Sequence, residues 1–331
     1  MEENTEQRVD LTLFSEKIQE LKDRITSVIV GQEQTVDLVL TAILANGHVL
    51  IEGVPGVAKT LLARLTARLI DADFSRVQFT PDLMPSDVLG TTVFNMKTNG
   101  FDFHQGPIFA DIVLVDEINR APAKTQAALF EVMEERQISI DGTTHRMGDL
   151  YTILATQNPV EQEGTYKLPE AQLDRFLMKI TMDYPSLEEE VNILERHHTN
   201  AALVKLDDIV PAITKEELLS LRAFMNQVFV DRTLLQYIAL IVQQTRTSKA
   251  VYLGASPRAS VAMLQSSKAY ALLQGRDFVT PEDIKFVAPY VLQHRLILTA
   301  EAEMEGYSPV KVTQRLIAVS YTHLTLPTIL R

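Results

Sequence analysis

The segment Gly53-Val54-Pro55-Gly56-Val57-Ala58-Lys59-Thr60 has the residue types and spacing of a phosphate-binding loop. It follows a short apolar run, 48–52, and precedes a stretch of helical character, 60–70. Glycines let successive backbone N–H groups turn inward around an anion, and a helix N-terminus adds its own unpaired N–H groups. We expect Lys59 to reach the β- and γ-phosphates of a nucleotide and the hydroxyl of Thr60 to hold Mg²⁺. Leu61, the next residue, is included in the predicted binding segment.

Ala58 departs from the usual pattern G-x-x-x-x-G-K-[ST], because it stands where the second glycine is expected. Alanine is the smallest alternative to glycine, so a non-positive φ is tolerable at this position. The competing interpretation is a Gly-Pro-Gly turn that Lys59 and Thr60 follow by chance. The segments downstream favour the binding loop.

Two carboxylates, Asp116 and Glu117, end the apolar run 112–115. This pattern is typical of a buried parallel strand, and ligands of such sheets gather at the carboxyl ends of the strands. Asp116 is then expected to bind Mg²⁺ beside Thr60, and Glu117 to act as general base on the attacking water. The alternative is an ordinary acidic turn after a core strand.

Asn158 follows a third apolar run, 151–156, and precedes a proline. An amide at a strand end can orient the attacking water against the γ-phosphate, so Asn158 is a candidate catalytic residue. A plain Asn-Pro turn is the alternative.

Two arginines complete the set of candidate catalytic residues. Arg175 lies in Leu173-Asp174-Arg175-Phe176, where its guanidinium could project to the γ-phosphate of a neighbouring subunit. The alternative is an Asp-Arg surface pair of little energetic weight. Arg258 lies in the first turn of a helix that Ser256 caps and Pro257 begins. A positive charge there opposes the helix dipole, which suggests contact with nucleotide phosphate.

Alternating strands and helices in the first half of the chain predict a parallel sheet covered on both faces. The five expected strands are 48–52, 76–79, 112–116, 151–156 and 176–181. Two helices precede the first strand. Asn99-Gly100 and Asp141-Gly142 predict two β-hairpin inserts between these elements.

The second half of the chain is expected to be a helical lid. We predict an α/β nucleotide-binding domain over 1–185, an all-α lid over 186–319 and a tail over 320–331. Thr280 is a predicted N-cap, and Pro289 is expected to break or kink the helix that follows. The tail lacks a helical period and differs in composition, so we interpret it as not native to the protein.

Composition bounds the remaining possibilities. The chain has 331 residues, a net charge of −12 and no cysteine. The acidic balance argues against broad nucleic-acid binding, since phosphate contacts need clustered Lys and Arg. The polar start, 1–4, and the absence of a long apolar run argue against a signal peptide or membrane span and for the cytoplasm. His197-His198 is interpreted as a helix end and not as a metal site.

In their order along the chain and in their residues, these motifs resemble the MoxR family of AAA+ ATPases. The matching segments, besides the loop, are residues 106–109, 116–122, 155–159, 168–176 and 254–258. The resemblance implies a P-loop AAA+ core with five parallel strands in the order 5-1-4-3-2, with ATP and Mg²⁺ as cofactors. It gives the seven residues Lys59, Thr60, Asp116, Glu117, Asn158, Arg175 and Arg258 the roles argued above. Val30-Gly31-Gln32 matches the segment that packs near adenine in such ATPases.

The function that the resemblance implies is ATP hydrolysis that drives chaperone-like remodelling of protein clients. A homo-oligomeric ring, a hexamer, is expected, with Arg175 acting in trans on the neighbouring site. A partner with a von Willebrand factor A domain is implied by the resemblance alone. Two alternatives are a metal-chelatase-like motor subunit and a nucleotide-dependent scaffold that does not hydrolyse ATP.

Overall fold

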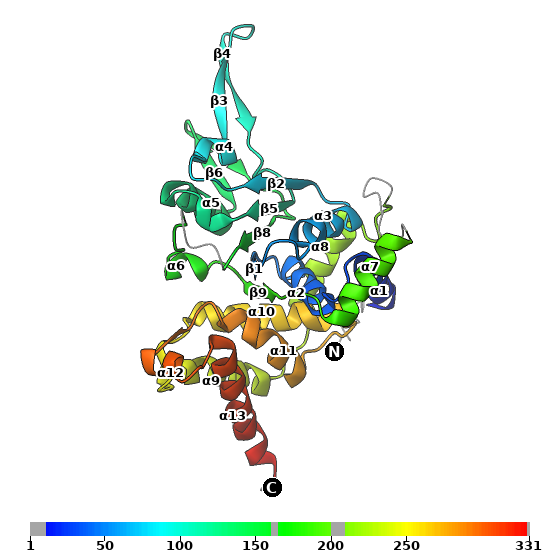
Figure 1. Ribbon diagram of the computed structural model, residues 1–331, viewed down its shortest axis with the longest axis vertical. Coiled ribbons are helices and arrows are strands. Elements are labelled where there is room, and N and C mark those ends of the chain that lie inside the picture. The colour runs from blue at the N-terminus through cyan, green and yellow to red at the C-terminus, as the bar shows by residue number, and fades with distance from the viewer. Residues whose placement is uncertain (1–10, 160–164, 200–208, 330–331) are drawn as a thin grey trace, which may run out of the picture.

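Five parallel strands form the central sheet of the computed structural model, which describes residues 11–159, 165–199 and 209–329 (Figure 1). The strands are β1 (Val49–Gly53), β2 (Phe74–Gln78), β5 (Ile112–Asp116), β8 (Thr152–Gln157) and β9 (Met178–Met182). Their order across the sheet is β2-β5-β8-β1-β9, and every neighbouring pair is parallel. Counted along the chain, this confirms the predicted order 5-1-4-3-2.

Helices cover both faces of the sheet, because successive side chains of a strand point to opposite sides. In β5, Ile112 and Leu114 join one hydrophobic core, whereas Val113 and Val115 join the other. Both faces of the sheet are therefore buried, which explains why the strands are continuous apolar runs. The first face carries α1 (Leu11–Val28), α2 (Glu33–Leu44) and α3 (Lys59–Leu69), and the second carries α4 (Pro85–Leu89) and α5 (Ala123–Glu135).

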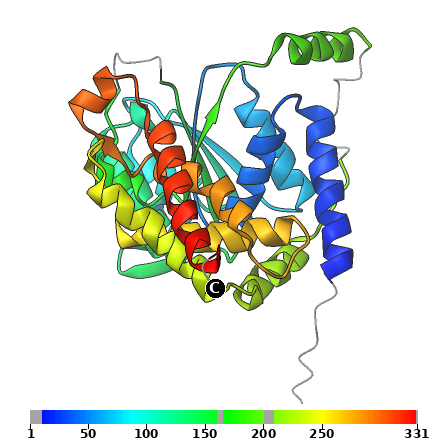
Figure 2. The ribbon, with the colours of Figure 1, turned by 90° about the horizontal axis from the view of Figure 1, so that it is seen from below.

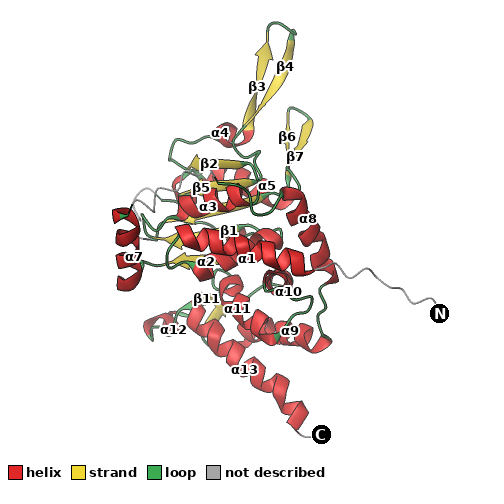
Figure 3. Ribbon diagram, turned by 90° about the vertical axis from the view of Figure 1, so that its right-hand side faces the viewer, coloured by secondary structure: helices red, strands yellow, loops and turns green. Residues whose placement is uncertain are grey.

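Both predicted hairpins are present. The longer one, β3 (Gly90–Asn95) with β4 (Gly100–Gln105), projects beyond the sheet, and the shorter one lies beside it (Figure 3). The shorter hairpin pairs β6 (Gln137–Ile140) with β7 (Thr143–Arg146). Its two-residue turn, Asp141-Gly142, has positive φ at both positions, as a type I′ turn requires.

The C-terminal part of the chain is the predicted helical lid. Most of its helices share one continuous hydrophobic core with α1, α2 and α3, whereas Leu298, Ala302 and Val312 form a small separate cluster. A short antiparallel pair of strands, β10 and β11, was not foreseen from the sequence. The elements after β9 are α7 (Leu187–His198), α8 (Lys215–Phe224), η3 (Met225–Gln227), α9 (Arg232–Thr247), β10 (Val251–Leu253), α10 (Pro257–Leu273), α11 (Pro281–Leu292), β11 (Ile297–Leu298), α12 (Ala300–Met304) and α13 (Pro309–Ile329).

Two local expectations differ from the structure. The helix α11 does not break at Pro289 but runs three residues past it, because its flanking positions Val287, Ala288 and Val291 are fully buried in the core. The expected tail is helical as far as Ile329, although its sequence lacks a helical period. The polar start, 1–4, and the last two residues of the tail lie outside the described residues.

Candidate functional site

The predicted phosphate loop joins the carboxyl end of β1 to the first turn of α3. Gly56 has a φ of +88°, and Ala58, at the N-cap of α3, has φ +60° and ψ +23°. Ala58 therefore adopts a left-handed backbone and not the non-positive φ that was considered tolerable for alanine. Alternation of left-handed and right-handed backbone turns successive N–H groups toward one point, and this geometry is imposed whether the residue is glycine or alanine. The loop is shaped as an anion cradle.

Apolar side chains within the loop attach it to the core. Val57 is buried, and Val54 and Leu61 are partly buried against the same hydrophobic cluster. Pro55 and Gly56 between them are exposed. The cradle is therefore fixed at its two sides and open at its turn, as a loop that receives a ligand from solvent must be.

The loop begins at Gly53, the last residue of β1, and ends at Lys59 and Thr60 in the first turn of α3. A Cβ added at Gly53 would lie 2.7 Å from the carbonyl oxygen of Met182 in β9, so this close approach of two backbones requires glycine. The Lys59 ammonium donates to the Gly53 carbonyl at 2.6 Å, across the mouth of the loop. Thr60 is half-buried in the first turn of α3. Lysine and threonine thus both lie in the first turn of α3, directly after the turn of the loop.

The predicted adenine segment, Val30 and Gly31, leads into α2. Gly31 has a φ of +72°, a backbone conformation that residues other than glycine rarely adopt. A Cβ there would come within 2.3 Å of the carboxyl carbon of Glu189 in α7. The backbone conformation therefore favours glycine at this position, and the Glu189 carboxylate lies directly against it.

The hydroxyl of Thr156 makes hydrogen bonds with both acidic residues at the end of β5. The Thr156 hydroxyl donates to the Asp116 carboxylate at 3.0 Å and accepts the Glu117 N–H at 3.0 Å. Arg76 donates to the other Asp116 oxygen at 2.6 Å, and Arg120 lies 2.9 Å from the Glu117 carboxylate. Glu117 has a φ of +56°, a backbone conformation that costs about 1–3 kcal/mol and is typical of functional sites.

The order of the strands places the phosphate loop, Asp116 and Asn158 around one gap at the carboxyl edge of the sheet. Because β8 lies between β1 and β5, the loop and Asp116 are two strand spacings, about 10 Å, apart. Asn158 follows β8 and therefore lies between them, with its side chain buried. A lysine, a threonine hydroxyl and a carboxylate around such a gap fit a nucleoside triphosphate with Mg²⁺. The metal would be held by Thr60 and Asp116, and it would neutralise developing charge on the phosphates.

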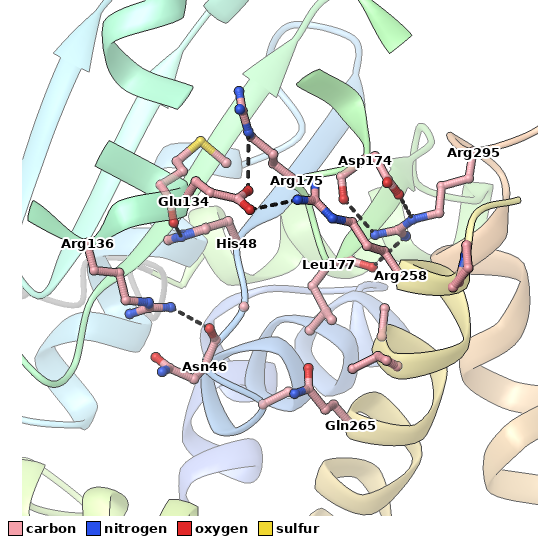
Figure 4. A pocket seen from close by; sticks show the side chains of 16 residues that line it. Asn46, His48, Glu134, Arg136, Asp174, Arg175, Leu177, Arg258, Gln265 and Arg295 are labelled. Carbon is pink, nitrogen blue, oxygen red and sulfur yellow. Dashed lines mark hydrogen bonds and ion pairs between the residues drawn. The ribbon is translucent and has the colours of Figure 1, made fainter. Parts of the chain in front are cut away.

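The two predicted arginines meet at the opposite edge of the sheet (Figure 4). Glu134, in the last turn of α5, accepts from Arg175 at 3.3 Å and from Arg258 at 2.9 Å. The Arg258 side chain is 59% exposed and the Arg175 side chain 30%. A single carboxylate thus pairs two guanidinium groups, which leaves one net positive charge facing solvent.

Asp174, next to Arg175, joins this edge to the lid. Its carboxylate accepts from Arg295 at 2.6 Å and from the Ser256 hydroxyl at 3.1 Å. Ser256 occupies the predicted N-cap position of α10, but its hydroxyl is used for this contact and not for capping. Arg295 is almost fully buried and also donates to the Phe176 carbonyl. These bonds fix the start of α10, and with it Arg258, against the sheet.

Strand direction separates the two halves of the site. Arg175 precedes β9, and the Leu177 N–H donates to the His48 carbonyl just before β1, so both lie at the amino edge. The phosphate loop follows β1. The five residues of β1 span about 17 Å at about 3.3 Å per residue. Neither arginine of the amino edge can therefore reach a nucleotide on the loop of its own chain.

His48 lines a hollow beside Arg175 and Arg258, and its imidazole is neutral. Burial lowers the pKa of His48 to about 3, and the positive charge of Arg136 adds to this effect. Its Nδ1 accepts the Ile153 N–H at 3.0 Å, and its Nε2 lies 3.2 Å from the Met133 carbonyl. His48 is therefore a structural link between strands and helix, with no acid–base role.

Four residues of these clusters were missed in the sequence: Arg76, Glu134, Thr156 and Arg295. Thr156 stands two positions before Asn158, within a motif that was recognised, and a polar residue at a buried strand end was its signal. The other three carry no local signal, because their partners are distant in the chain.

Comparison with known proteins identifies the family. The model of the ATPase family associated with various cellular activities matches residues 48–178, and that of the AAA lid domain matches 243–316. YeaC of Bacillus subtilis is 47% identical over 89% of the chain and 92% of its own length. Chaperone MoxR1 of Mycobacterium tuberculosis is 44% identical over 88% of the chain and 79% of its own length. The chain belongs to the MoxR family of AAA+ ATPases.

A solved structure supports the same assignment of fold. A crystal structure from Cytophaga hutchinsonii matches with a TM-score of 0.85 and 40% identity, over 93% of this chain and 95% of that one. Membership of the MoxR family accounts for the parallel sheet, the phosphate loop and the lid, and it makes this an ATP-binding protein. None of the described helices combines the length and apolar character needed to span a bilayer.

Proposed function

We propose that this MoxR-family protein hydrolyses ATP to ADP and phosphate in a homo-oligomeric ring, a hexamer, and uses the cycle to remodel protein clients. The observation that carries the proposal is the separation of the two half-sites. The phosphate loop, Asp116 and Glu117 lie at one edge of the sheet, and Arg175 and Arg258 lie at the other.

Each residue of the loop edge has a task in hydrolysis. Lys59 leaves the Gly53 carbonyl and binds the β- and γ-phosphates, while Thr60 and Asp116 hold Mg²⁺. Glu117 accepts a proton from the attacking water, which Asn158 orients. The Thr156 hydroxyl keeps the Glu117 backbone in the conformation that the general base needs.

The arginine edge completes the site of the next subunit. Head-to-tail contacts that repeat by rotation close into a ring, and they bring the amino edge of one copy to the carboxyl edge of another. Arg175 and Arg258 then stabilise the charge that develops on the γ-phosphate, a contribution of about 10³–10⁵ in rate where such arginines have been studied. Glu134 aligns them as a pair before the subunits meet.

Remodelling of a protein client is supported by the relative named Chaperone MoxR1. A partner with a von Willebrand factor A domain is proposed on the resemblance alone, and a location in the cytoplasm on the lack of a long apolar run in the sequence. The β3–β4 hairpin projects from the sheet domain (Figure 1), and its side chains Phe94 and Phe101 are 47% and 73% exposed, so it is the element proposed to contact a client.

Mixing two inactive variants tests whether the site is shared. Lys59→Ala removes nucleotide binding and Arg258→Ala removes the contribution to the neighbour, so neither variant alone should turn over ATP at the wild-type rate. In a 1:1 mixture, about a quarter of the interfaces join an intact loop to an intact arginine edge. Turnover should therefore recover to about a quarter of the wild-type value.

The matched control mixes Lys59→Ala with Glu117→Gln, since both changes damage the loop edge and no interface becomes complete. This mixture should stay inactive. Arg258 acts within its own chain if the first mixture also stays inactive although it assembles. Turnover per subunit of the wild type should rise with protein concentration. A monomer with concentration-independent turnover would contradict the ring.

A further inference from the structure

The helix α7 carries an uncovered apolar stripe. Leu187, Val191 and Leu194 follow the spacing i, i+4, i+7 and lie along one face. Their exposed fractions are 78%, 46% and 68%, and Tyr184, just before the helix, is 71% exposed. Among the described residues, none of the twelve in α7 is buried. Figure 2 shows α7 at the rim of the molecule, standing apart from the main body. A contiguous apolar surface of this kind marks an interaction site.

The opposite face of α7 holds the helix to its own chain. The Glu189 carboxylate lies against Gly31, and the Arg196 guanidinium donates to the carbonyl of Ser27 at the end of α1. At 3.6 residues per turn, Glu189 and Arg196 lie about 180° around the helix from the apolar stripe. The stripe is therefore aimed away from the chain by the contacts that position the helix.

The place of α7 in the fold indicates what covers the stripe. α7 follows β9 directly, so it lies at the carboxyl edge of the sheet together with the phosphate loop. In the proposed ring, this edge faces the amino edge of the next copy. The occupant is therefore a second copy of this chain, and the inference rests on the proposed function in this respect.

The amino edge presents a hollow with both charged and apolar walls. It has a volume of about 460 Å³ and lies beside Arg175 and Arg258; Leu177 and Met133, both buried, and Val261 contribute its apolar part. Val261, one turn beyond Arg258 in α10, is 55% exposed. One chain thus carries an apolar helix face at one edge and, at the other, a hollow with Val261 as an exposed apolar residue among charged side chains. These two surfaces cannot meet within one chain, but they meet in a head-to-tail contact.

We propose that the apolar stripe of α7 packs on the hollow around Val261 of the next subunit in the ring. Because the polar face of α7 touches Gly31 in the predicted adenine segment, the contact links the nucleotide site of one copy to the lid of the next. Subunit contact and nucleotide binding then stabilise each other.

The test measures assembly in the Glu117→Gln background with ATP, by analytical ultracentrifugation over a range of protein concentrations. Leu194→Asp and Val261→Lys should each raise the concentration for half-assembly by about 10-fold or more, because each replaces an apolar side chain of the contact by a charged one. The double variant places opposite charges across every interface, so it should recover part of this loss. Binding of a fluorescent ATP analogue to the separate subunits should not change.

The control is Val319→Asp, which adds the same charge to an apolar residue of α13 that is 51% exposed; it should assemble like its parent. If Leu194→Asp and Val261→Lys also assemble like their parent, this inference is overturned and the shared nucleotide site stands. A lower melting temperature of the Leu194→Asp monomer would overturn it as well, since the stripe would then pack within its own chain. A parent that stays monomeric with ATP overturns both the proposed function and this inference.

Discussion

The left-handed backbone of Ala58 predicts that glycine at this position stabilises the protein. Ala58 has φ +60° and ψ +23° at the start of α3. This conformation costs an L-residue about 1–2 kcal/mol, because Cβ approaches the following carbonyl oxygen. Glycine avoids that cost but loses about 0.5–1 kcal/mol more conformational entropy on folding. Ala58→Gly should therefore raise the free energy of unfolding by about 0.5–1 kcal/mol, the difference between the two terms.

Urea denaturation without added nucleotide measures this difference, and the chain offers a matched control. Ala127 is exposed in the interior of α5, where the backbone is right-handed. The same substitution there, Ala127→Gly, should lower the free energy of unfolding by about 1 kcal/mol. One chemical change thus has opposite signs at two positions, and only the backbone conformation distinguishes them.

The reasoning is refuted if both substitutions destabilise the protein by similar amounts. That result would mean that the loop relaxes to a right-handed backbone at Ala58 or that its strain is negligible. Affinity for nucleotide should be nearly unchanged in Ala58→Gly, because the N–H groups of the cradle keep their directions.

Three further predictions concern single contacts. Thr156→Val leaves the Asp116 carboxylate and a buried N–H without their shared hydroxyl, so it should cost about 1–3 kcal/mol in urea denaturation and lower ATP turnover; unchanged stability would exclude the bridge. Burial lowers the pKa of His294 well below its usual range, so its neutral form contributes stability that is complete above pH 6.5 and lost as the pH falls. Between pH 7 and pH 5 the wild type should lose about 2 kcal/mol that His294→Gln does not lose, whereas the exposed His104→Gln should follow the wild type. Glu134→Gln should lower turnover of the assembled protein and leave nucleotide binding unchanged, because only the alignment of the arginine pair is lost; equal turnover would contradict that role.

The sequence by itself determined the elements whose residues are adjacent in the chain. The phosphate loop, the acidic pair after its apolar strand and the two hairpin turns are each specified within ten residues, because backbone conformation at glycine, proline and asparagine is a local property. The alternation of strands and helices then fixed a parallel sheet, and the family resemblance supplied its strand order. These predictions agree with the structure.

Only the tertiary structure decided which distant residues meet. Glu134 contacts Arg175, 41 positions away, and Arg258, 124 positions away. No local pattern encodes these contacts, because they follow from the direction of β9 and from the packing of α10 against the sheet. The same packing placed both arginines at the edge opposite the phosphate loop. A motif can therefore name candidate groups for a nucleotide site, but the direction of the strands decides at which edge of the sheet each group lies.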